Sequence, residues 1–307
     1  MDFLSHGQYR KDIFEYYRKK CIRITNFCTF VGLVILLLWI LAPLFIKEFR
    51  FKKKDGSIMV YRNSVLNLYF SFISISFYEQ IYPFIYILES IYTIHTVVEV
   101  VLSNVLIMQF CWMLSAQLKT IVSKYESFGY KILDKEIDPE FEETYIEDFK
   151  SVFSDNVKLS ICIKKFYVFM RPMTVFYIGI NFHGLIVLIY MFTLNYFKNG
   201  STLTLTSLKL LITASLALLN LFLFCYFYGY LENQISLINF AMYNCNWTNK
   251  NIKFKKMLSM AMILNNRINL RMNVTVQKSV KLEMFTSIIH VSYSIISLLV
   301  KKTKNSN

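Results

Sequence analysis

The chain has 307 residues, of which 55% are apolar, and it carries a formal net charge of +14. This apolar share and a mean hydropathy of +0.41 exclude an ordinary soluble domain and indicate a membrane protein. The positive charge does not indicate a nucleic-acid-binding protein. The lysines and arginines lie beside apolar runs, where they orient membrane proteins and meet anionic lipid headgroups.

Long apolar runs predict the architecture, because a helix needs about 20 mostly apolar residues to cross a bilayer. Five runs are expected to cross, with approximate bounds 28–46, 84–116, 172–197, 210–231 and 284–300. The shorter, serine-containing stretch 66–78 is interpreted as an interfacial or re-entrant approach to the second run. We therefore expect an all-α membrane protein with a single domain over 1–307. Its bundle of about five transmembrane helices carries cytoplasmic helical loops at 117–171 and 233–282.

The distribution of cations among the loops predicts the orientation. The side that holds the N-terminus and loops 119–171 and 233–281 carries 23 of the 34 Lys and Arg residues. The positive-inside rule places this side in the cytoplasm and, after five crossings, the C-terminus outside. The outer side then contains a glycosylation sequon at Asn199, whereas the sequons at Asn246 and Asn273 lie inside and are expected to remain unmodified.

The last cytoplasmic loop contains a two-faced segment at 252–271. Lysines and arginines occupy one face, and apolar residues recur at helical spacing on another: Phe254, Leu258, Ala261, Leu264 and Ile268. Such a helix either lies on the inner leaflet or packs against partner subunits, and the two interpretations stay open. The other loop has six carboxylates between Asp138 and Asp148, which are interpreted as a solvated loop.

Several ionisable residues lie within the predicted spans, where charge is costly. Glu89 is interpreted as reaching water near the outer interface of a long helix. His95 and Glu99 are four residues apart, so they share a helix face and are able to hydrogen-bond. The cysteines and histidines lack metal-ligand spacing, and no phosphate-binding glycine loop or nucleophile elbow occurs. The sequence therefore predicts no metal site, no cofactor and no enzyme.

The C-terminal third resembles the signature of insect odorant receptors, in particular the hemipteran and aphid members. The residues that carry this resemblance lie at the end of the fourth predicted span, just after it and in the last span. They are Cys225, Gly229, Tyr243, Trp247, Phe285, Tyr293 and Ser294. The similarity covers most of the chain and is most specific over 222–300.

This resemblance implies an olfactory receptor of the plasma membrane of sensory neurons. The chain would be the odorant-binding subunit of a heteromeric ligand-gated cation channel, a hetero-tetramer formed with a co-receptor subunit. It would bind a small volatile ligand, with membrane lipids around it. Members of the family have seven spans, so the resemblance implies that the first two are lacking. A gustatory-type chemoreceptor channel and a truncated, non-functional receptor fragment are the alternatives.

The resemblance also implies that the last span lines the pore. Ser292, Ile296 and Val300 recur at every fourth residue along one helix face, and Leu299 lies beside the outer end of that face. A ring of aliphatic side chains at a constriction blocks ions by dewetting. By their position relative to Tyr293, residues 296 and 300 match the hydrophobic gate of the family. Without the resemblance, the same pattern indicates a lipid-facing helix.

Candidate ligand-binding residues are the apolar and aromatic positions in the outer halves of the first two spans. They are Trp39, Ala42, Phe84, Tyr86, Leu88 and Tyr92. Pockets for small ligands are concave and mostly apolar, with few polar groups to orient the ligand. Helix packing or an aromatic interfacial belt is the alternative interpretation of the same residues.

Overall fold

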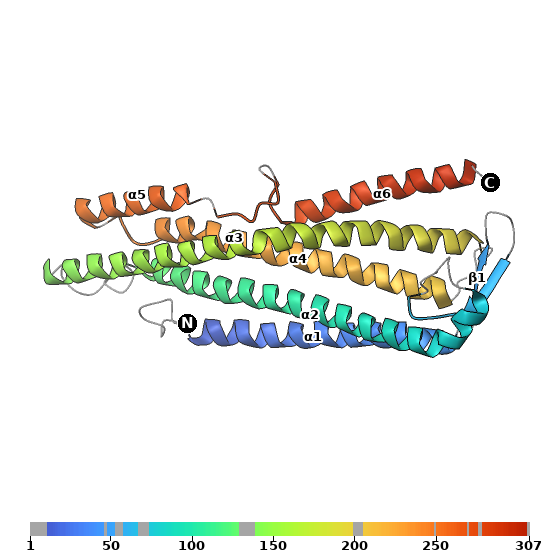
Figure 1. Ribbon diagram of the computed structural model, residues 1–307. Helices are drawn as coiled ribbons and strands as arrows, with labels where there is room; N and C mark the ends of the chain where they lie inside the picture. Colours follow the sequence, from blue (N-terminus) through green and yellow to red (C-terminus); the bar gives the residue numbers. More distant parts are fainter. Residues whose placement is uncertain are drawn as a thin grey trace. The chain divides into compact units, whose positions relative to one another are not determined.

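The computed structural model describes residues 11–45, 48–52, 58–66, 74–128, 139–198, 205–248, 250–268, 270–275 and 278–305. These residues form six helices and one antiparallel hairpin (Figure 1). The helices are α1 (Lys11–Phe45), α2 (Ile75–Ser127), α3 (Pro139–Lys198), α4 (Leu205–Tyr243), α5 (Ile252–Arg267) and α6 (Leu282–Asn305). The strands are β1 (Glu48–Lys52) and β2 (Ile58–Arg62), with Glu48 opposite Arg62 and Lys52 opposite Ile58.

Five of the described helices, α1 to α4 and α6, are long and apolar enough to cross a membrane. This confirms the all-α architecture and the count of five. The helices extend well beyond the apolar runs, because α2 has 53 residues and α3 has 60. Once a helix exists, each further residue adds one backbone hydrogen bond, so polar residues beyond the membrane continue it.

One expectation about the connecting segments is wrong, and one element was not foreseen. The acidic stretch after Asp138 is not a loop, because α3 begins at Pro139 and buries Tyr145 and Phe149 on its inner face. The β1–β2 hairpin was not expected from the sequence. Of the proposed re-entrant stretch, residues 67–73 lie outside the described residues, and α2 begins directly after Ser74, whose hydroxyl accepts a hydrogen bond from the Phe77 amide.

The chain divides into two compact units. Unit 1 comprises Met1–Ile22, Ile107–Gly184 and Leu219–Ser294, and unit 2 comprises Arg23–Leu106, Leu185–Leu218 and Ile295–Asn307. All five apolar helices contribute residues to both units, whereas α5 belongs to unit 1 alone. The prediction of a single domain over 1–307 stays a prediction.

Helix α5 is held in unit 1 by part of its predicted apolar face, whereas Leu264 of that face is exposed. Phe254, Leu258 and Ala261 are buried, and the Phe254 ring packs edge-on against Phe149 of α3 at 5.2 Å between centroids. The Asn251 side chain caps the helix by accepting a hydrogen bond from the Phe254 amide at 2.8 Å. The apolar face therefore covers α3 of the same chain.

Side-chain amides add a polar connection among α3, α4 and α5. Asn156 of α3 donates to Asn265 of α5 at 3.2 Å, and Asn265 donates to Asn239 of α4 at 2.8 Å. Asn239 in turn donates to Asn266. Of these side chains only Asn156 is buried, so its bond to Asn265 is the one whose loss would leave a buried polar group unsatisfied.

Candidate functional site

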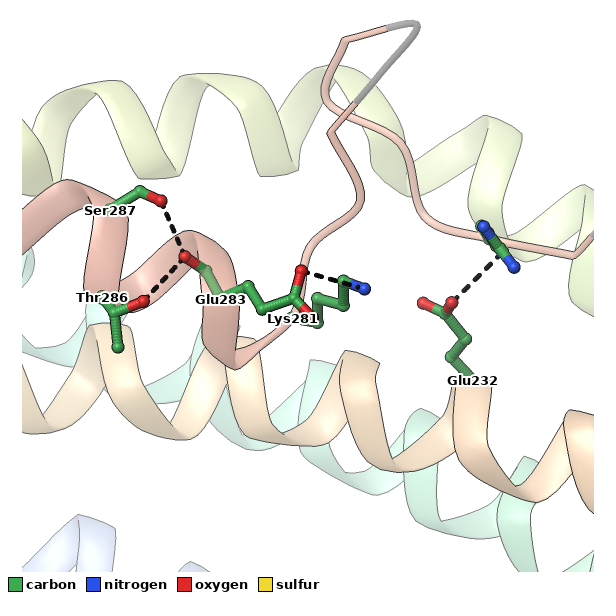
Figure 2. Close-up of polar contacts among 6 residues, drawn as sticks. Glu232, Lys281, Glu283, Thr286 and Ser287 are labelled. Atoms are coloured by element: carbon green, nitrogen blue, oxygen red, sulfur yellow. Dashed lines mark hydrogen bonds and ion pairs between the residues drawn. The ribbon is translucent and has the colours of Figure 1, made fainter.

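Helix α6 begins in a cluster of local polar contacts (Figure 2). The Lys281 ammonium lies 3.1 Å from a carboxylate oxygen of Glu283 in the first turn. The hydroxyls of Thr286 and Ser287 donate to the Glu283 carbonyl at 2.9 and 2.8 Å. Hydroxyls that bond back to their own helix need no outside partner, so Thr286 and Ser287 add little polar cost to an apolar helix.

The segment between α5 and α6 packs on α4. Leu270, Met272 and Val280 are buried, and the Val280 amide donates to the Met272 carbonyl at 2.8 Å. The Arg271 guanidinium pairs with the Glu232 carboxylate of α4 at 3.2 Å between Nε and Oε1. The start of α6 is thereby anchored to α4.

Three of the signature residues form the contact between α4 and the start of α6. Cys225 is fully buried, and a Cβ added to Gly229 would lie 3.5 Å from the Cβ of Lys281. The Phe285 ring packs edge-on against Phe222 at 5.5 Å between centroids. Small residues permit close helix contact in membranes, so this part of the signature has a packing role.

The other signature residues lie elsewhere. At the end of α4, the Trp247 indole N–H donates to the Tyr243 carbonyl at 3.1 Å, while the Tyr243 side chain is exposed. Tyr293 of α6 is exposed, and the Ser294 hydroxyl donates to the His290 carbonyl at 3.0 Å. These contacts are local to each helix.

The candidate gate residues share one face of α6. Ser292 is only 2% exposed, and Ile296, Leu299 and Val300 are half-buried. Leu298 on the opposite face is 69% exposed. The structure therefore brings the four residues to one face, and in the single chain that face is the less exposed one.

Three of the six candidate ligand residues lie together in unit 2. The Trp39 indole N–H donates to the Thr213 hydroxyl at 3.0 Å, and the Tyr86 hydroxyl donates to the Ile40 carbonyl at 2.8 Å. Ala42 is buried one turn beyond Trp39. Hydrogen bonds thus join α1 to α4 at Trp39 and α1 to α2 at the neighbouring Ile40.

The other three candidates face away. Phe84, Leu88 and Tyr92 are 65%, 50% and 62% exposed, and they recur at every fourth residue on one outward stripe of α2. The helical period explains this separation, because Tyr86 lies two residues from both Phe84 and Leu88 and so projects in a different direction. The structure does not bring this stripe to Trp39.

Two charged residues of unit 2 were missed or misjudged: Lys209, which lies beside Trp39, and Glu89. The Lys209 ammonium lies 3.8 Å from the centroid of a Trp39 ring and donates to the Val65 carbonyl at 3.2 Å. Glu89 does not reach water, because it is 5% exposed and accepts a hydrogen bond from the Leu66 amide at 2.9 Å. The available sequence signal for Lys209 was its place one residue before a charge-free run.

The remaining ionisable residues form no comparable site. His95 and Glu99 approach to 3.5 Å between Nδ1 and Oε2, as their spacing predicted, but both side chains are more than half exposed. Among the residues that the structure describes, no group of three His, Cys, Asp or Glu side chains is placed to hold a metal ion. Asn199 lies outside the described residues.

Comparison with known proteins gives one family match and similar solved structures. The family model described as 7tm odorant receptor matches residues 6–293. The insect olfactory receptor OR5 from Machilis hrabei has a similar structure, with a TM-score of 0.70 at 12% identity over 95% of this chain and 68% of that chain. The structure of OR5 in complex with eugenol has a TM-score of 0.61 at 13% identity, over 96% of this chain and 75% of that chain. No curated protein shows a significant sequence match.

The family match extends over nearly the whole chain, from before α1 into α6. Its range includes every residue that carried the resemblance except Ser294, and the helical architecture is shared with a solved olfactory receptor. These findings make the chain a multi-pass membrane receptor of olfaction rather than an enzyme. The chain belongs to the 7tm odorant receptor family.

Proposed function

We propose that this receptor is the odorant-binding subunit of a heteromeric ligand-gated cation channel in the plasma membrane of sensory neurons. The observation that carries the proposal is α6, whose residues from Met284 to Val300 contain no Asp, Glu, Lys or Arg. Phe285 in the first turn of α6 packs on Phe222 of α4, and the connector before α6 pairs with α4 through Arg271 and Glu232. A helix held at one end and apolar along its length is suited to line a pore and to move.

In this proposal Ile296 and Val300 form the gate, with Ser292 and Leu299 on the same face. Four copies of an aliphatic face around an axis exclude water from a narrow constriction, and a small outward shift of each helix readmits it. Ile296, Leu299 and Val300 remain partly exposed in the single chain, which leaves them accessible to neighbouring subunits. Leu298 lies on the opposite side of α6, so its substitution serves as the control for substitutions of the gate residues.

The ligand is proposed to bind around Trp39, Ala42 and Tyr86. Two of these residues are aromatic, and the polar atoms of both side chains already have partners, so an apolar ligand would contact ring and aliphatic carbon. Lys209 lies over one Trp39 ring and would border such a ligand. The related receptor that was solved with eugenol motivates a small aromatic ligand. The exposed stripe of Phe84, Leu88 and Tyr92 is assigned to lipid.

The co-receptor subunit is proposed to contact α5. The outer face of this helix bears a groove of about 420 Å³ lined by apolar and basic side chains: Ile252, Lys255, Lys256, Ser259, Met260 and Ile263. Large exposed apolar side chains outside the membrane favour a protein partner over solvent. The proposed orientation places this groove and the N-terminus in the cytoplasm, the C-terminus outside, and Asn199 in a position to be glycosylated.

Co-expression with the co-receptor in oocytes tests the proposal. Odorant-evoked cation current is expected only when both subunits are present, and Ile296→Ala should increase the current in the absence of odorant. Leu298→Ala is the matched control and should leave the basal current unchanged. Current in the absence of the co-receptor would favour the gustatory-type alternative. An effect of Leu298→Ala without an effect of Ile296→Ala would refute the gate assignment.

A further inference from the structure

Helix α2 carries a narrow polar strip on its outer surface within unit 2. We call four exposed residues that recur at helical spacing on one face the seam: His95, Thr96, Glu99 and Ser103. The side chains of His95 and Glu99 are 68% and 65% exposed. The other carboxylate of this span, Glu89, is buried and accepts a hydrogen bond from the Leu66 amide. Glu99 therefore differs from Glu89 in facing away from the protein.

The contact between α1 and α2 fixes the depth of the seam. A Cβ added to Gly32 of α1 would lie 2.6 Å from Val101 Cγ2 and 3.9 Å from Val97 Cγ1. Gly32 lies in the charge-free run 24–46, about 12 Å along the helix from one end of that run and about 21 Å from the other. Glu99 is two residues from each valine, so it shares their depth and projects away from α1. The seam thus lies well inside the bilayer.

Glu99 is costly at this depth unless protein or water covers it. Ionisable side chains within a bilayer usually face the protein interior or a water-filled cavity. Lys and Arg reach the headgroups with their long side chains, but Glu is too short to do so from mid-depth. The contact with His95 joins one nitrogen and one oxygen, Nδ1 and Oε2, at 3.5 Å. It leaves His95 Nε2 and Glu99 Oε1 for groups outside the pair.

The surroundings of the seam favour a helix over water as its cover. Exposed apolar side chains border the seam, with Leu102 on one side and Val100 on the other. Water in an open channel would wet these side chains as well, whereas a single helix covers a strip of this width. Small and hydroxyl-bearing residues let membrane helices approach closely, and polar groups then bond across the contact. The Thr96 hydroxyl already donates to the Tyr92 carbonyl at 2.9 Å, so it adds no polar demand.

The charge of Glu99 identifies the kind of helix that fits. In a medium of low dielectric, a carboxylate pairs most favourably with a cationic side chain. A second copy of this chain has no such side chain to offer. No Lys or Arg occurs in any of its apolar runs, 28–46, 84–116, 172–197, 210–231 and 284–300. The complementary helix therefore belongs to a different polypeptide.

We propose that the seam is a docking site for a transmembrane helix of the partner subunit, and that this helix presents a Lys or Arg side chain to Glu99. His95 stays beside the carboxylate and supplies a second polar group to the same helix. Naming the partner subunit as the co-receptor rests on the proposed function, whereas the chemistry of the seam does not.

Site-specific photo-crosslinking in the full-length receptor, co-expressed with the co-receptor, tests the seam. Photoreactive benzoylphenylalanine replaces Leu102 at the border of the seam and, as a control, Phe84 on the stripe assigned to lipid. We expect a co-receptor adduct from position 102 and none from position 84. Glu99→Gln removes the charge and keeps the shape, and should lower the adduct yield about tenfold. Glu126→Gln, at an exposed glutamate near the end of α2, should leave the yield unchanged.

The receptor expressed alone provides a second measurement. Without the partner helix Glu99 faces lipid, so Glu99→Leu should raise the melting temperature of the receptor in lipid nanodiscs. The same substitution should lower the adduct yield when the co-receptor is present. A melting temperature that does not rise would overturn the placement of Glu99 on an uncovered face.

The outcomes separate this proposal from the proposed function. An adduct yield unchanged by Glu99→Gln would show that the partner does not recognise the carboxylate. Labelling of Ser103→Cys in the complex by a membrane-impermeant thiol reagent would show that the seam lines water, and adducts with lipid alone would show that it faces lipid. Each of these results overturns the docking.

The two proposals are able to fail independently. Association of the subunits without an adduct refutes the seam and leaves the proposed function standing. An adduct without odorant-evoked current refutes the proposed function and leaves the seam standing. If the subunits do not associate, both fail.

Discussion

Gly32 of α1 lies so close to Val101 of α2 that a Cβ added to the glycine would stand 2.6 Å from Val101 Cγ2. Both residues belong to unit 2. Valine is branched at Cβ and has little rotamer freedom in a helix, so it is unable to move aside cheaply. We predict that Gly32→Ala lowers the free energy of unfolding by about 1–3 kcal/mol through overpacking, measured as a lower melting temperature in detergent.

The matched control for this substitution is Gly179→Ala in α3. No atom lies within 4 Å of a Cβ built at that position. Alanine favours helix over glycine by about 1 kcal/mol, so this variant should be neutral or slightly stabilised. Equal melting temperatures for the two variants would show that α1 and α2 do not approach closely at Gly32.

Phe254 is predicted to hold α5 on unit 1. Its ring is fully buried and packs against Phe149 and Tyr145 at 5.2 and 5.0 Å between centroids. Phe254→Ala removes this contact and leaves a cavity, for an expected loss of about 3–5 kcal/mol. Protease protection of the α5 segment measures the effect, and Lys253→Ala, at the neighbouring exposed position, should retain full protection.

The Glu232–Arg271 pair is expected to contribute little to stability on its own. The Arg271 side chain is 55% exposed and that of Glu232 is 19% exposed, so solvent screens much of their attraction. A double-mutant cycle with alanine should give a coupling energy of about 0.2–1 kcal/mol that decreases in 1 M salt. A coupling well above that range would indicate that the connector before α6 is less solvated than the structure shows.

Cys245 follows the end of α4, and burial raises the pKa of its thiol to about 11. Only the thiolate reacts with alkylating reagents, so at pH 8 Cys245 should react roughly 100-fold more slowly in the folded chain than in the unfolded chain. The rate should rise about tenfold per pH unit up to that pKa. Mass spectrometry of alkylated peptides from folded and denatured receptor provides the measurement.

The same shift predicts the sign of a pH effect on stability. Between about pH 9 and 11 the unfolded chain has lost the Cys245 proton while the folded chain retains it. The unfolded state then binds fewer protons, so the free energy of unfolding falls as pH rises through this window. Cys245→Ser should flatten this part of the profile. If Cys245→Ser leaves the slope of unfolding free energy against pH unchanged, the pH dependence comes from other groups.

The proposed orientation predicts which sequons carry sugar. Asn199→Gln should remove one glycosidase-sensitive shift in electrophoretic mobility, because that residue is expected on the outer side. Asn246→Gln and Asn273→Gln should change nothing. A shift that disappears with Asn246→Gln instead would invert the orientation and move the α5 groove outside the cell.

Much of the fold was predictable because membrane helices are specified locally. A run such as 210–231 contains enough apolar residues to cross a bilayer without reference to the rest of the chain. The buried face of α5 was predictable for a similar reason, since Phe254, Leu258 and Ala261 repeat with the helical period. The acidic start of α3 was misassigned because charge density indicates solvent exposure but not backbone conformation.

The candidate ligand residues were only half predictable. Aromatic character and depth selected both Tyr86 and Phe84, but only packing shows that Tyr86 bonds the α1 backbone while Phe84 is 65% exposed. Glu89 was misjudged for a related reason. Its position in the span indicated contact with water, whereas its carboxylate has a backbone amide as partner.

The sequence by itself determined the membrane class, the five crossings, the two-faced helix and the family, since each depends on composition or on residues close together in the chain. Only the tertiary structure decided that Lys209 bonds Val65, 144 residues earlier, and covers Trp39. A contact of that kind depends on how α1, α2 and α4 pack within unit 2, and no local period or composition encodes it.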